Sequence, residues 1–350
     1  MVRIVHTGDM HFDSPFAQLP SEVALMRREE QRETFMRIIM AVKENKADML
    51  LIAGDVFDSR FVSASTTVFL REAFAEIQDT PIFIAPGNHD FLSPESLYKT
   101  VDFGENVHIF GNCISACNIG ECTVYGYGFP ERFIKKGVLD SSFKHKKGTV
   151  GILLMHGDVS SESDYNPVST EILEQSSLNY VALGHVHTYS GIRNAGETLY
   201  AYSGVPESRH FDEVGRGGII IGDISETGND LSFVPTAKRE NITVTVDITG
   251  MNTHESVYNK IAESLLEENL YKVTLTGKKD SRFFVDTEGL QASLSKLCAY
   301  IKIQDKTGIH FSEKAESVME KRFVERLSQR DDEIAHRALA FGLSAFGRIR

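Results

Sequence analysis

The feature that most constrains this chain is a series of short polar clusters, each placed directly after an apolar run of strand length. In chain order these are Asp9-Met10-His11, Gly54-Asp55-Val56-Phe57-Asp58, Gly87-Asn88-His89-Asp90, His156-Gly157-Asp158 and Gly184-His185-Val186-His187. Sheet proteins usually build ligand sites beyond the carboxyl ends of their strands. Buried histidines and aspartates are costly without partners, so five clusters of this kind predict a shared metal site better than independent turns.

The spacing within the clusters supports this interpretation. Residues two apart in extended backbone point to the same side, so Asp9 and His11 can reach one ion, and His185 and His187 can reach one centre. A carboxylate has two oxygens and can bridge two cations. The adjacent glycines let the backbone turn sharply and approach an ion or a phosphate. Carboxylate, imidazole and amide ligands without thiolate suit manganese, iron or zinc better than calcium.

The apolar runs predict an α/β sandwich of two sheets with helices outside, part of it antiparallel. The first part of the chain carries a long helix from about 23 to 46, with Ser21 as a plausible N-cap. The strands expected there lie at 3–6, 49–53, 82–85, 107–110, 124–127, 150–156, 180–183, 199–202 and 218–223. After about residue 241 a small α+β unit follows, with helices at 255–266 and 290–297 and strands at 242–248, 272–276, 282–285 and 300–303. The tail from 312 to 346 is charged and helix-prone.

Charge and composition restrict the function. The formal net charge of −12 argues against a broad DNA-coating surface. It does not exclude a nuclease, because two divalent cations would add positive charge where phosphate binds. The basic stretches Lys135-Lys136, with Lys144, Lys146 and Lys147, and Lys278-Lys279, with Arg282, are more typical of solvated loops. Without a Cys-x-x-Cys pair, the cysteines are expected to be ordinary thiols. No apolar run approaches the roughly 20 residues of a membrane span, so a cytoplasmic location without membrane contact is expected.

Together and in this order, the clusters resemble the calcineurin-like metallophosphoesterase superfamily. Within it, His11-Phe12-Asp13-Ser14-Pro15-Phe16 resembles the YhaO branch of the SbcD-like DNA repair exonucleases. The resemblance covers about residues 1–235 and, loosely, the unit that follows. It implies a four-layer sandwich of two mixed sheets flanked by helices. The expected divisions are a catalytic domain at 1–238, a small α+β capping domain at 239–310 and a helical C-terminal segment at 311–350.

The resemblance also implies two bound divalent metal ions, usually manganese in the nuclease branch, with iron or zinc as alternatives. The first ion would be bound by Asp9, His11 and His187. The second would be bound by Asn88, His156 and His185. Asp55 would bridge both ions.

Further roles carry over from the same family. His89 matches the catalytic histidine, which steadies the transition state or protonates the leaving oxygen. Asp58 and Asp90 are better placed to orient ligands, although a salt link to a surface lysine is an alternative for Asp90. Arg209 or His210, in the loop at 203–210, would contact the substrate phosphate; the alternative there is an ordinary turn with an exposed arginine.

The leading hypothesis is therefore a two-metal-dependent DNA exonuclease or endonuclease that hydrolyses phosphodiester bonds in DNA repair. One alternative is a phosphatase or phosphodiesterase acting on a small nucleotide or phosphoprotein, which the negative charge favours. Another is a scaffold without catalysis, since a fold does not fix a function. The resemblance implies DNA, a coiled-coil ATPase of the SbcC or YhaN type and a second copy of the chain as partners. The apolar positions of the tail fit either a docking element or packing on its own domain.

Overall fold

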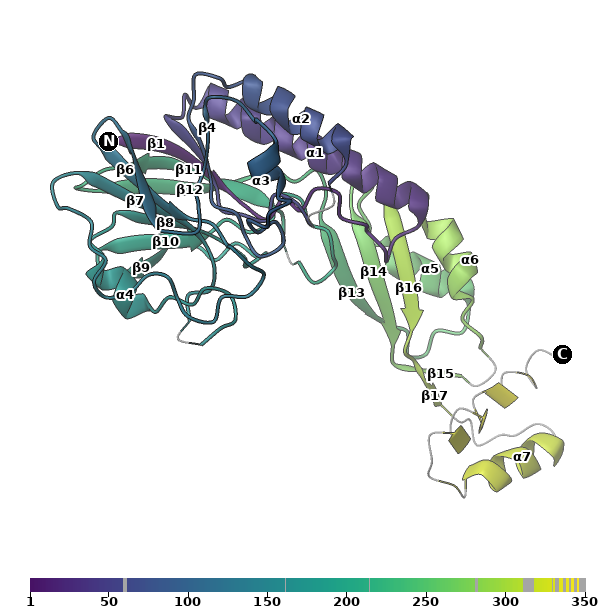
Figure 1. Ribbon diagram of the computed structural model, residues 1–350. Coiled ribbons are helices and arrows are strands. Elements are labelled where there is room, and N and C mark those ends of the chain that lie inside the picture. The colour runs from purple at the N-terminus through teal and green to yellow at the C-terminus, as the bar shows by residue number, and fades with distance from the viewer. Residues whose placement is uncertain are drawn as a thin grey trace. The chain divides into compact units, whose positions relative to one another are not determined.

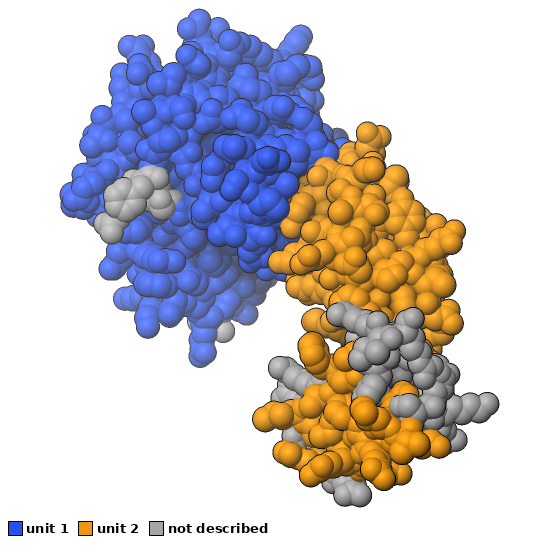
Figure 2. All heavy atoms as spheres, turned by 90° about the vertical axis from the view of Figure 1, so that its right-hand side faces the viewer, with its two compact units in different colours: residues 1–240 blue, residues 241–350 orange. Residues whose placement is uncertain are grey.

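The computed structural model describes residues 1–58, 62–160, 162–213, 215–280, 283–310 and 318–328, with isolated positions beyond. The chain divides into two compact units, residues 1–240 and residues 241–350, coloured separately in Figure 2. Every cluster described above lies in the first unit.

The first sheet of this unit combines parallel strands with an antiparallel edge. Its order is β12-β11-β1-β2-β3-β4, with β1 (Val2–Thr7), β2 (Met49–Ile52), β3 (Ile82–Ile84), β4 (Val107–Ile109), β11 (Gly218–Ile224) and β12 (Asn229–Pro235). The strands β1 to β4 are parallel, with Ile4 opposite Met49, whereas β11 and β12 are antiparallel. Parallel strands end at the same edge, so the segments after β1, β2 and β3 meet there.

The second sheet is also mixed. Its order is β5-β6-β7-β8-β10-β9, with β5 (Ser115–Ile119), β6 (Cys122–Tyr127), β7 (Val150–His156), β8 (Tyr180–Gly184), β9 (Arg193–Ala195) and β10 (Thr198–Tyr202). The strands β6, β7, β8 and β10 are parallel, and β5 and β9 pair antiparallel at the two edges. The carboxyl ends of β7 and β8 carry the last two polar clusters.

Successive residues of one strand enter different cores, which explains why the strands read as continuous apolar runs. Ile4 packs between the sheets with Ile152 of β7. Its neighbour Val5 packs beneath the helices with Phe35. The helices α1 (Ser21–Glu44) and α2 (Ala64–Ala75) lie side by side over the first sheet (Figure 1). Short helices follow at α3 (Leu97–Thr100) and α4 (Thr170–Gln175), and α4 packs on the outer face of the second sheet. The expected α/β class, two mixed sheets flanked by helices, is confirmed.

Local details differ from expectation. Ser21 is the first helical residue, and Pro20 occupies the N-cap without a side-chain hydrogen bond, because proline suits an extended entry to a helix. The strands β5, β9 and β12 and the helix α2 were not expected, since edge strands and short helices carry weak hydrophobic periodicity.

The second unit has a parallel sheet in the order β13-β14-β16, and one helix lies in each of the two connections between these strands. Its elements are β13 (Asn241–Asp247), α5 (His254–Ala262), β14 (Leu270–Thr276), α6 (Thr287–Leu294) and β16 (Tyr300–Asp305), beside a small pair, β15 (Lys278–Asp280) and β17 (Gly308–His310). Of the strand expected at 282–285, position 282 lies outside the described residues, and the prediction is wrong for the rest: Phe283 and Val285 are buried in the core without strand pairing. The expected tail helix is present as α7 (Val318–Ser328), and most positions beyond it lie outside the described residues.

Candidate metal centre

The two sheets bring their polar clusters to one place. Asp9 and Asp55 follow β1 and β2 of the first sheet, and the backbone N–H of Asp9 donates to the Gly54 carbonyl at 3.0 Å. His156 ends β7 of the second sheet, and its Nδ1–H donates across to the Ala53 carbonyl at 2.8 Å. Residues more than one hundred positions apart thus share a single buried centre.

The first group, Asp9, His11 and His187, converges on one point. Their ligand atoms all lie within 4.8 Å of one another. Nε2 of His11 is 3.2 Å from Nε2 of His187, and Nε2 of His187 is 4.0 Å from Oδ1 of Asp9. Because the Nδ1 atoms of both rings donate to carboxylates, the two Nε2 lone pairs face each other, and a shared cation would stabilise them.

The second group, Asn88, His156 and His185, is built around an amide oxygen. Oδ1 of Asn88 lies 2.9 Å from Nε2 of His156 and 3.2 Å from Nδ1 of His185. Asp55 lies between the groups: its Oδ2 is 3.6 Å from Nε2 of His11 and 3.5 Å from Nε2 of His156. From this position the Asp55 carboxylate would hold the cations of both groups.

His11, His187 and His156 share one arrangement of their protons, whereas His185 faces Asn88 with its Nδ1. Nδ1 of His11 donates to Oδ1 of Asp58 at 3.1 Å, and Nδ1 of His187 donates to Oε1 of Glu213 at 2.9 Å. The Nδ1 donation of His156 to a backbone carbonyl completes the set. Because these partners accept hydrogen bonds, each ring presents an unprotonated Nε2 to the centre, which is the form that binds metals. The donor set therefore fits divalent cations.

The pKa values of the buried groups also indicate a site for cations. Burial, with repulsion from Asp55 adding to it, raises the pKa of Asp9 to about 7, and burial also raises the pKa of Asp55. Burial lowers the pKa of both His156 and His185 to about 4. Two buried carboxylates among neutral imidazoles repel each other until positive charge is placed between them, so bound cations would offset this cost.

From the sequence, Asp9 and His11 are expected to converge because the backbone is extended. The two side chains do converge, but the backbone there is not extended. Both residues have left-handed backbone, with φ of 54° and 49°, and so has Asp55 with φ of 49°. The backbone after β1 is therefore coiled rather than extended, and it turns both side chains inward. Such conformations cost about 1 to 3 kcal/mol each in non-glycine residues and concentrate at functional sites.

Two positions beside the centre must be glycine, because neighbouring atoms lie where a Cβ would be. A Cβ on Gly87 would lie 2.2 Å from Oδ1 of Asp55, and one on Gly184 would lie 1.9 Å from the Ala53 carbonyl oxygen. Any side chain at these positions would push the two sheets or the Asp55 carboxylate apart.

His89 stands at the wall of an open cavity of about 630 Å³, which His187 and Arg209 also line. Its Nδ1 donates to the backbone carbonyl of Asp58 at 3.0 Å, and its side chain is 33% exposed. The backbone N–H of His89 donates to Oδ1 of Asp55 at 2.9 Å. The ring is thus fixed beside the centre while part of the side chain stays exposed to the cavity.

Arg209 and His210 both line this cavity. The guanidinium of Arg209 is only 5% exposed and pairs with Oδ1 of Asp58 at 3.0 Å and with Oε1 of Glu213 at 3.4 Å. The alternative of an exposed arginine in a turn does not hold. Arg209 contacts the two carboxylates that hold His11 and His187, so it supports the first group indirectly.

Asp90 is buried and lies behind the ligands. It accepts hydrogen bonds from the backbone N–H groups of Gly87 and Val56 at 2.7 Å, and from the Tyr98 hydroxyl at 2.6 Å. The alternative of a surface lysine partner is wrong, because burial excludes an exposed cation and polar backbone groups satisfy the carboxylate. Asp90 thus fixes the loops that present Asp55 and Asn88.

The sequence pattern of the calcineurin-like phosphoesterase family matches residues 2–189. The chain belongs to this family. The family hydrolyses phosphoesters with divalent metal ions, so the predicted resemblance is confirmed at this level. Among the described residues, no helix is long and apolar enough to cross a membrane.

Curated relatives of this phosphoesterase include YhaO of Bacillus subtilis, an uncharacterized metallophosphoesterase, 27% identical over 246 residues that cover 66% of this chain and 59% of YhaO. The DNA double-strand break repair protein Mre11 of Saccharolobus solfataricus is 24% identical over 292 residues, covering 77% of this chain and 72% of Mre11. A component of the SbcCD nuclease of B. subtilis is 24% identical over 257 residues, covering 61% of this chain and 64% of that component. The chain thus spans less than two thirds of YhaO and of the SbcCD component.

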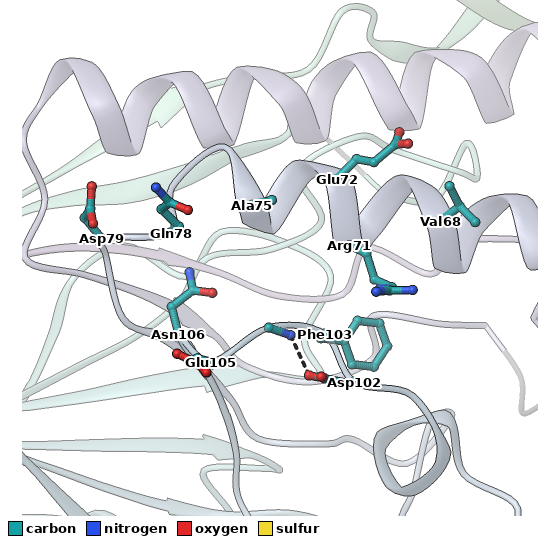
Figure 3. Close-up of a pocket in the computed structure, with 11 residues that line it drawn as sticks. Val68, Arg71, Glu72, Ala75, Gln78, Asp79, Asp102, Phe103, Glu105 and Asn106 are labelled. Atoms are coloured by element: carbon teal, nitrogen blue, oxygen red, sulfur yellow. Dashed lines mark hydrogen bonds between the residues drawn. The ribbon is translucent and has the colours of Figure 1, made fainter.

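A larger hollow of about 780 Å³ lies elsewhere on the phosphoesterase unit, between α2 and the segment before β4 (Figure 3). Its lining includes Arg71, Glu72, Asp102 and Phe103 and none of the candidate ligands. The smaller cavity beside His89 is therefore the one that adjoins the candidate ligands.

Glu213 was missed from the sequence. It follows no strand and belongs to no cluster, yet it accepts from His187 and from the backbone N–H of Arg209. Burial alone would raise the pKa of Glu213, but the hydrogen bond from His187 and the Arg209 charge lower it to about 2. The only sequence signal for such a residue would be an acidic side chain near the Arg209 loop, which is too common to be informative.

Proposed function

We propose that this chain is a two-metal-dependent nuclease that hydrolyses phosphodiester bonds in DNA, acting in cytoplasmic DNA repair. The observation that carries the proposal is the pair of ligand groups around Asp55, directly beside an open cavity that His89 lines. The choice of DNA rests on the relatives whose names describe DNA break repair and nuclease activity.

Each residue has a proposed role. Asp9, His11 and His187 would hold one divalent ion, and Asn88, His156 and His185 would hold the other. Asp55 would hold both. When bound, the two ions supply an activated water and neutralise charge on the phosphoryl oxygens. Manganese is the proposed metal, although iron and zinc accept the same nitrogen and oxygen ligands.

His89 would act on the leaving group. With Nδ1 donating to the Asp58 carbonyl, Nε2 is the nitrogen that is free to face the substrate. In the protonated imidazole, Nε2 carries a proton that it can give to the departing sugar oxygen. Asp58 and Asp90 are proposed as positioning residues, because Asp58 accepts from His11 and Arg209 and Asp90 accepts from the backbone of the ligand-bearing loops.

Substrate phosphate would enter the cavity along Arg209 and His210. The paired state of Arg209 makes its main proposed role the placement of Asp58 and Glu213, with phosphate contact as a secondary role. His210 is the stronger proposal for direct contact, since it lines the same cavity and is less buried than Arg209.

Further partners are also proposed. The helix α7 exposes Val318 and Met319, which are 72% and 70% accessible. We propose that such apolar positions receive a coiled-coil ATPase of the SbcC or YhaN type, or a second copy of the chain. Co-purification of the tagged chain with its ATPase, compared with Val318→Asp, tests this: loss of the complex in the variant is expected, and an unchanged complex contradicts it.

The test of function is a cleavage assay on end-labelled single- and double-stranded DNA with manganese, comparing wild type with His89→Ala and with His108→Ala, an exposed histidine of β4, as the matched control. Progressive shortening by wild type and the control, with a loss of at least about a hundredfold in His89→Ala, is expected. Hydrolysis of bis(p-nitrophenyl) phosphate without DNA cleavage would instead favour a small-molecule phosphodiesterase. Bound metal without hydrolysis of either substrate would favour a scaffold.

A further inference from the structure

A ladder of aromatic rings leads from the second group to the surface. The ring of Tyr165 lies 4.5 Å from that of His185, with 35° between the planes. The ring of Phe133 lies 5.6 Å from that of Tyr165, with 46° between the planes. The guanidinium of Arg132 lies 5.7 Å from the centre of the Phe133 ring. Phe133 is 47% exposed, so the ladder ends in solvent.

The ladder is fixed to the candidate ligands by the backbone. The N–H of Ile134 donates to the Asp164 carbonyl, and the N–H of Asn166 donates to the Ile134 carbonyl, both at 2.7 Å. The side-chain amide of Asn166 then donates to the carbonyl of His156 at 3.1 Å. Two segments far apart in sequence are thus paired with each other and tied to a candidate ligand, which holds the rings in a defined place.

Phe133 does not belong to any of the apolar cores found among the described residues. Phe133 instead packs against Tyr165 and is 47% exposed, so part of its ring is available to a ligand. The neighbouring cations are Arg132, Lys135 and Lys136, all exposed, in a chain whose net charge is −12. Exposed rings beside cations are the elements that proteins use to stack unpaired bases and to attract the phosphates between them.

We propose that Arg132, Phe133 and Tyr165 form a stacking platform for an unpaired nucleobase adjacent to the phosphate that is cut. This inference rests on the proposed nuclease function and narrows its substrate to strands with at least one unpaired base near the cleavage point. Bases within a duplex already stack on each other, so their faces are covered. Every base has a flat face, so the platform discriminates little between sequences.

The cavity beside His89 and the ladder flank different groups of the centre. That cavity is lined by His187 and by none of Asn88, His156 and His185. The ladder starts at His185. A strand whose phosphate lies at Asp55 would therefore extend one way into the cavity and place a neighbouring base on the rings.

The test is equilibrium binding, which does not depend on turnover. Manganese-loaded protein carrying His89→Ala is titrated with a fluorescent single-stranded oligothymidylate and with the same strand lacking bases at its central positions. Phe133→Leu keeps an apolar side chain but removes the ring, and Phe133→Trp keeps a ring. We expect Phe133→Leu to weaken binding of the normal strand by roughly 5- to 100-fold and Phe133→Trp to retain the affinity of the parent protein. The base-free strand should bind both variants with the same affinity.

A control for the loss of positive charge uses a cation near the end of β7 that lies away from His156. Arg132→Ala is compared with Lys147→Ala, an exposed cation just before β7, about 20 Å along that β-strand from His156. Only Arg132→Ala should weaken binding of the normal DNA strand. Equal affinity of Phe133→Leu and its parent for the normal DNA strand would overturn the platform while leaving DNA cleavage by wild type intact. Failure of wild type to bind or cut any DNA would overturn the proposed function itself.

Discussion

The two ligand groups are held in opposite ways. His187 of the first group donates to the Glu213 carboxylate at 2.9 Å, and Arg209 pairs with the same carboxylate. His156 of the second group donates to a neutral backbone carbonyl, and His185 packs against the ring of Tyr165. One group is thus fixed by charges and the other by neutral dipoles and rings.

The pKa values reflect this difference. Burial lowers the pKa of both His187 and His185, but hydrogen bonding to Glu213 reverses the effect at His187, whose pKa is raised. The pKa of His185 stays lowered, at about 4. A metal must therefore compete with a proton for His187 in mildly acidic solution, whereas His156 and His185 are already neutral there. The first group should therefore respond more strongly to changes of charge.

The largest effect is expected at Asp55, because both groups share this residue and the difference between their supports does not apply to it. Asp55→Ala removes the carboxylate that lies 3.6 Å from His11 and 3.5 Å from His156. We expect loss of phosphodiester hydrolysis by at least about a thousandfold, because both ions lose a ligand at once. Metal content and hydrolysis are measured beside Asp230→Ala, an exposed aspartate of β12. A variant that retains two ions and full rate would show that Asp55 does not join the groups.

The second prediction concerns Asp9 and the pH. Its pKa is 3.8 in the unfolded chain and about 7 in the metal-free fold, so the fold binds more protons between these values. The free energy of unfolding contributed by Asp9 therefore falls as pH rises from about 4 to about 7 and then levels off. Asp9→Asn removes this titration. The free energy of unfolding of Asp9→Asn, relative to that of wild type, should therefore increase with pH by the order of a few kcal/mol.

This is measured by urea unfolding in the presence of a chelator at several pH values. Added manganese should reverse the order, because the wild-type carboxylate then gains a cation. A constant difference between the two proteins from about pH 4 to about pH 8 would contradict the assigned environment of Asp9.

The sequence predicted the ligand clusters and the family well, because both depend on patterns local to the ends of strands. Each cluster follows an apolar run, and parallel strands necessarily place such ends together. The helix α1 and most central strands were predicted for the same reason, since burial on both faces gives continuous apolar runs. Whether the seven predicted residues bind metal stays a prediction, which the Asp55 and Asp9 experiments address.

The supporting residues could not be predicted. Glu213 reaches His187 through a loop, and Tyr165 reaches His185 through a segment that pairs with residues near 134. These contacts depend on how loops fold back over the sheet edge, for which a single sequence offers no periodicity. The left-handed backbone at Asp9 and His11 was hidden for a related reason, because tertiary contacts impose it against local preference.

The third prediction tests the charged support directly. Glu213→Gln keeps a hydrogen-bond acceptor for His187 but removes the charge that Arg209 and His187 share. We expect manganese affinity or hydrolysis to fall by about 10- to 100-fold, the usual effect of losing a partner that orients a metal ligand. Glu226→Gln, in an exposed loop, is the matched control. Wild-type affinity in Glu213→Gln would mean that geometry alone positions His187.

The smallest effect is expected from the corresponding change beside the second group. Oδ2 of Asp158 lies 3.6 Å from Nε2 of His185, beyond hydrogen-bond distance, and the side chain is 26% exposed. Solvent therefore weakens its influence, and the imidazole of His185 packs against the neutral ring of Tyr165. Asp158→Asn should change manganese affinity and hydrolysis by less than about threefold, measured beside Glu213→Gln. A tenfold loss in Asp158→Asn would mean that the second group also depends on a carboxylate, and the contrast between a charged and a neutral support would no longer hold.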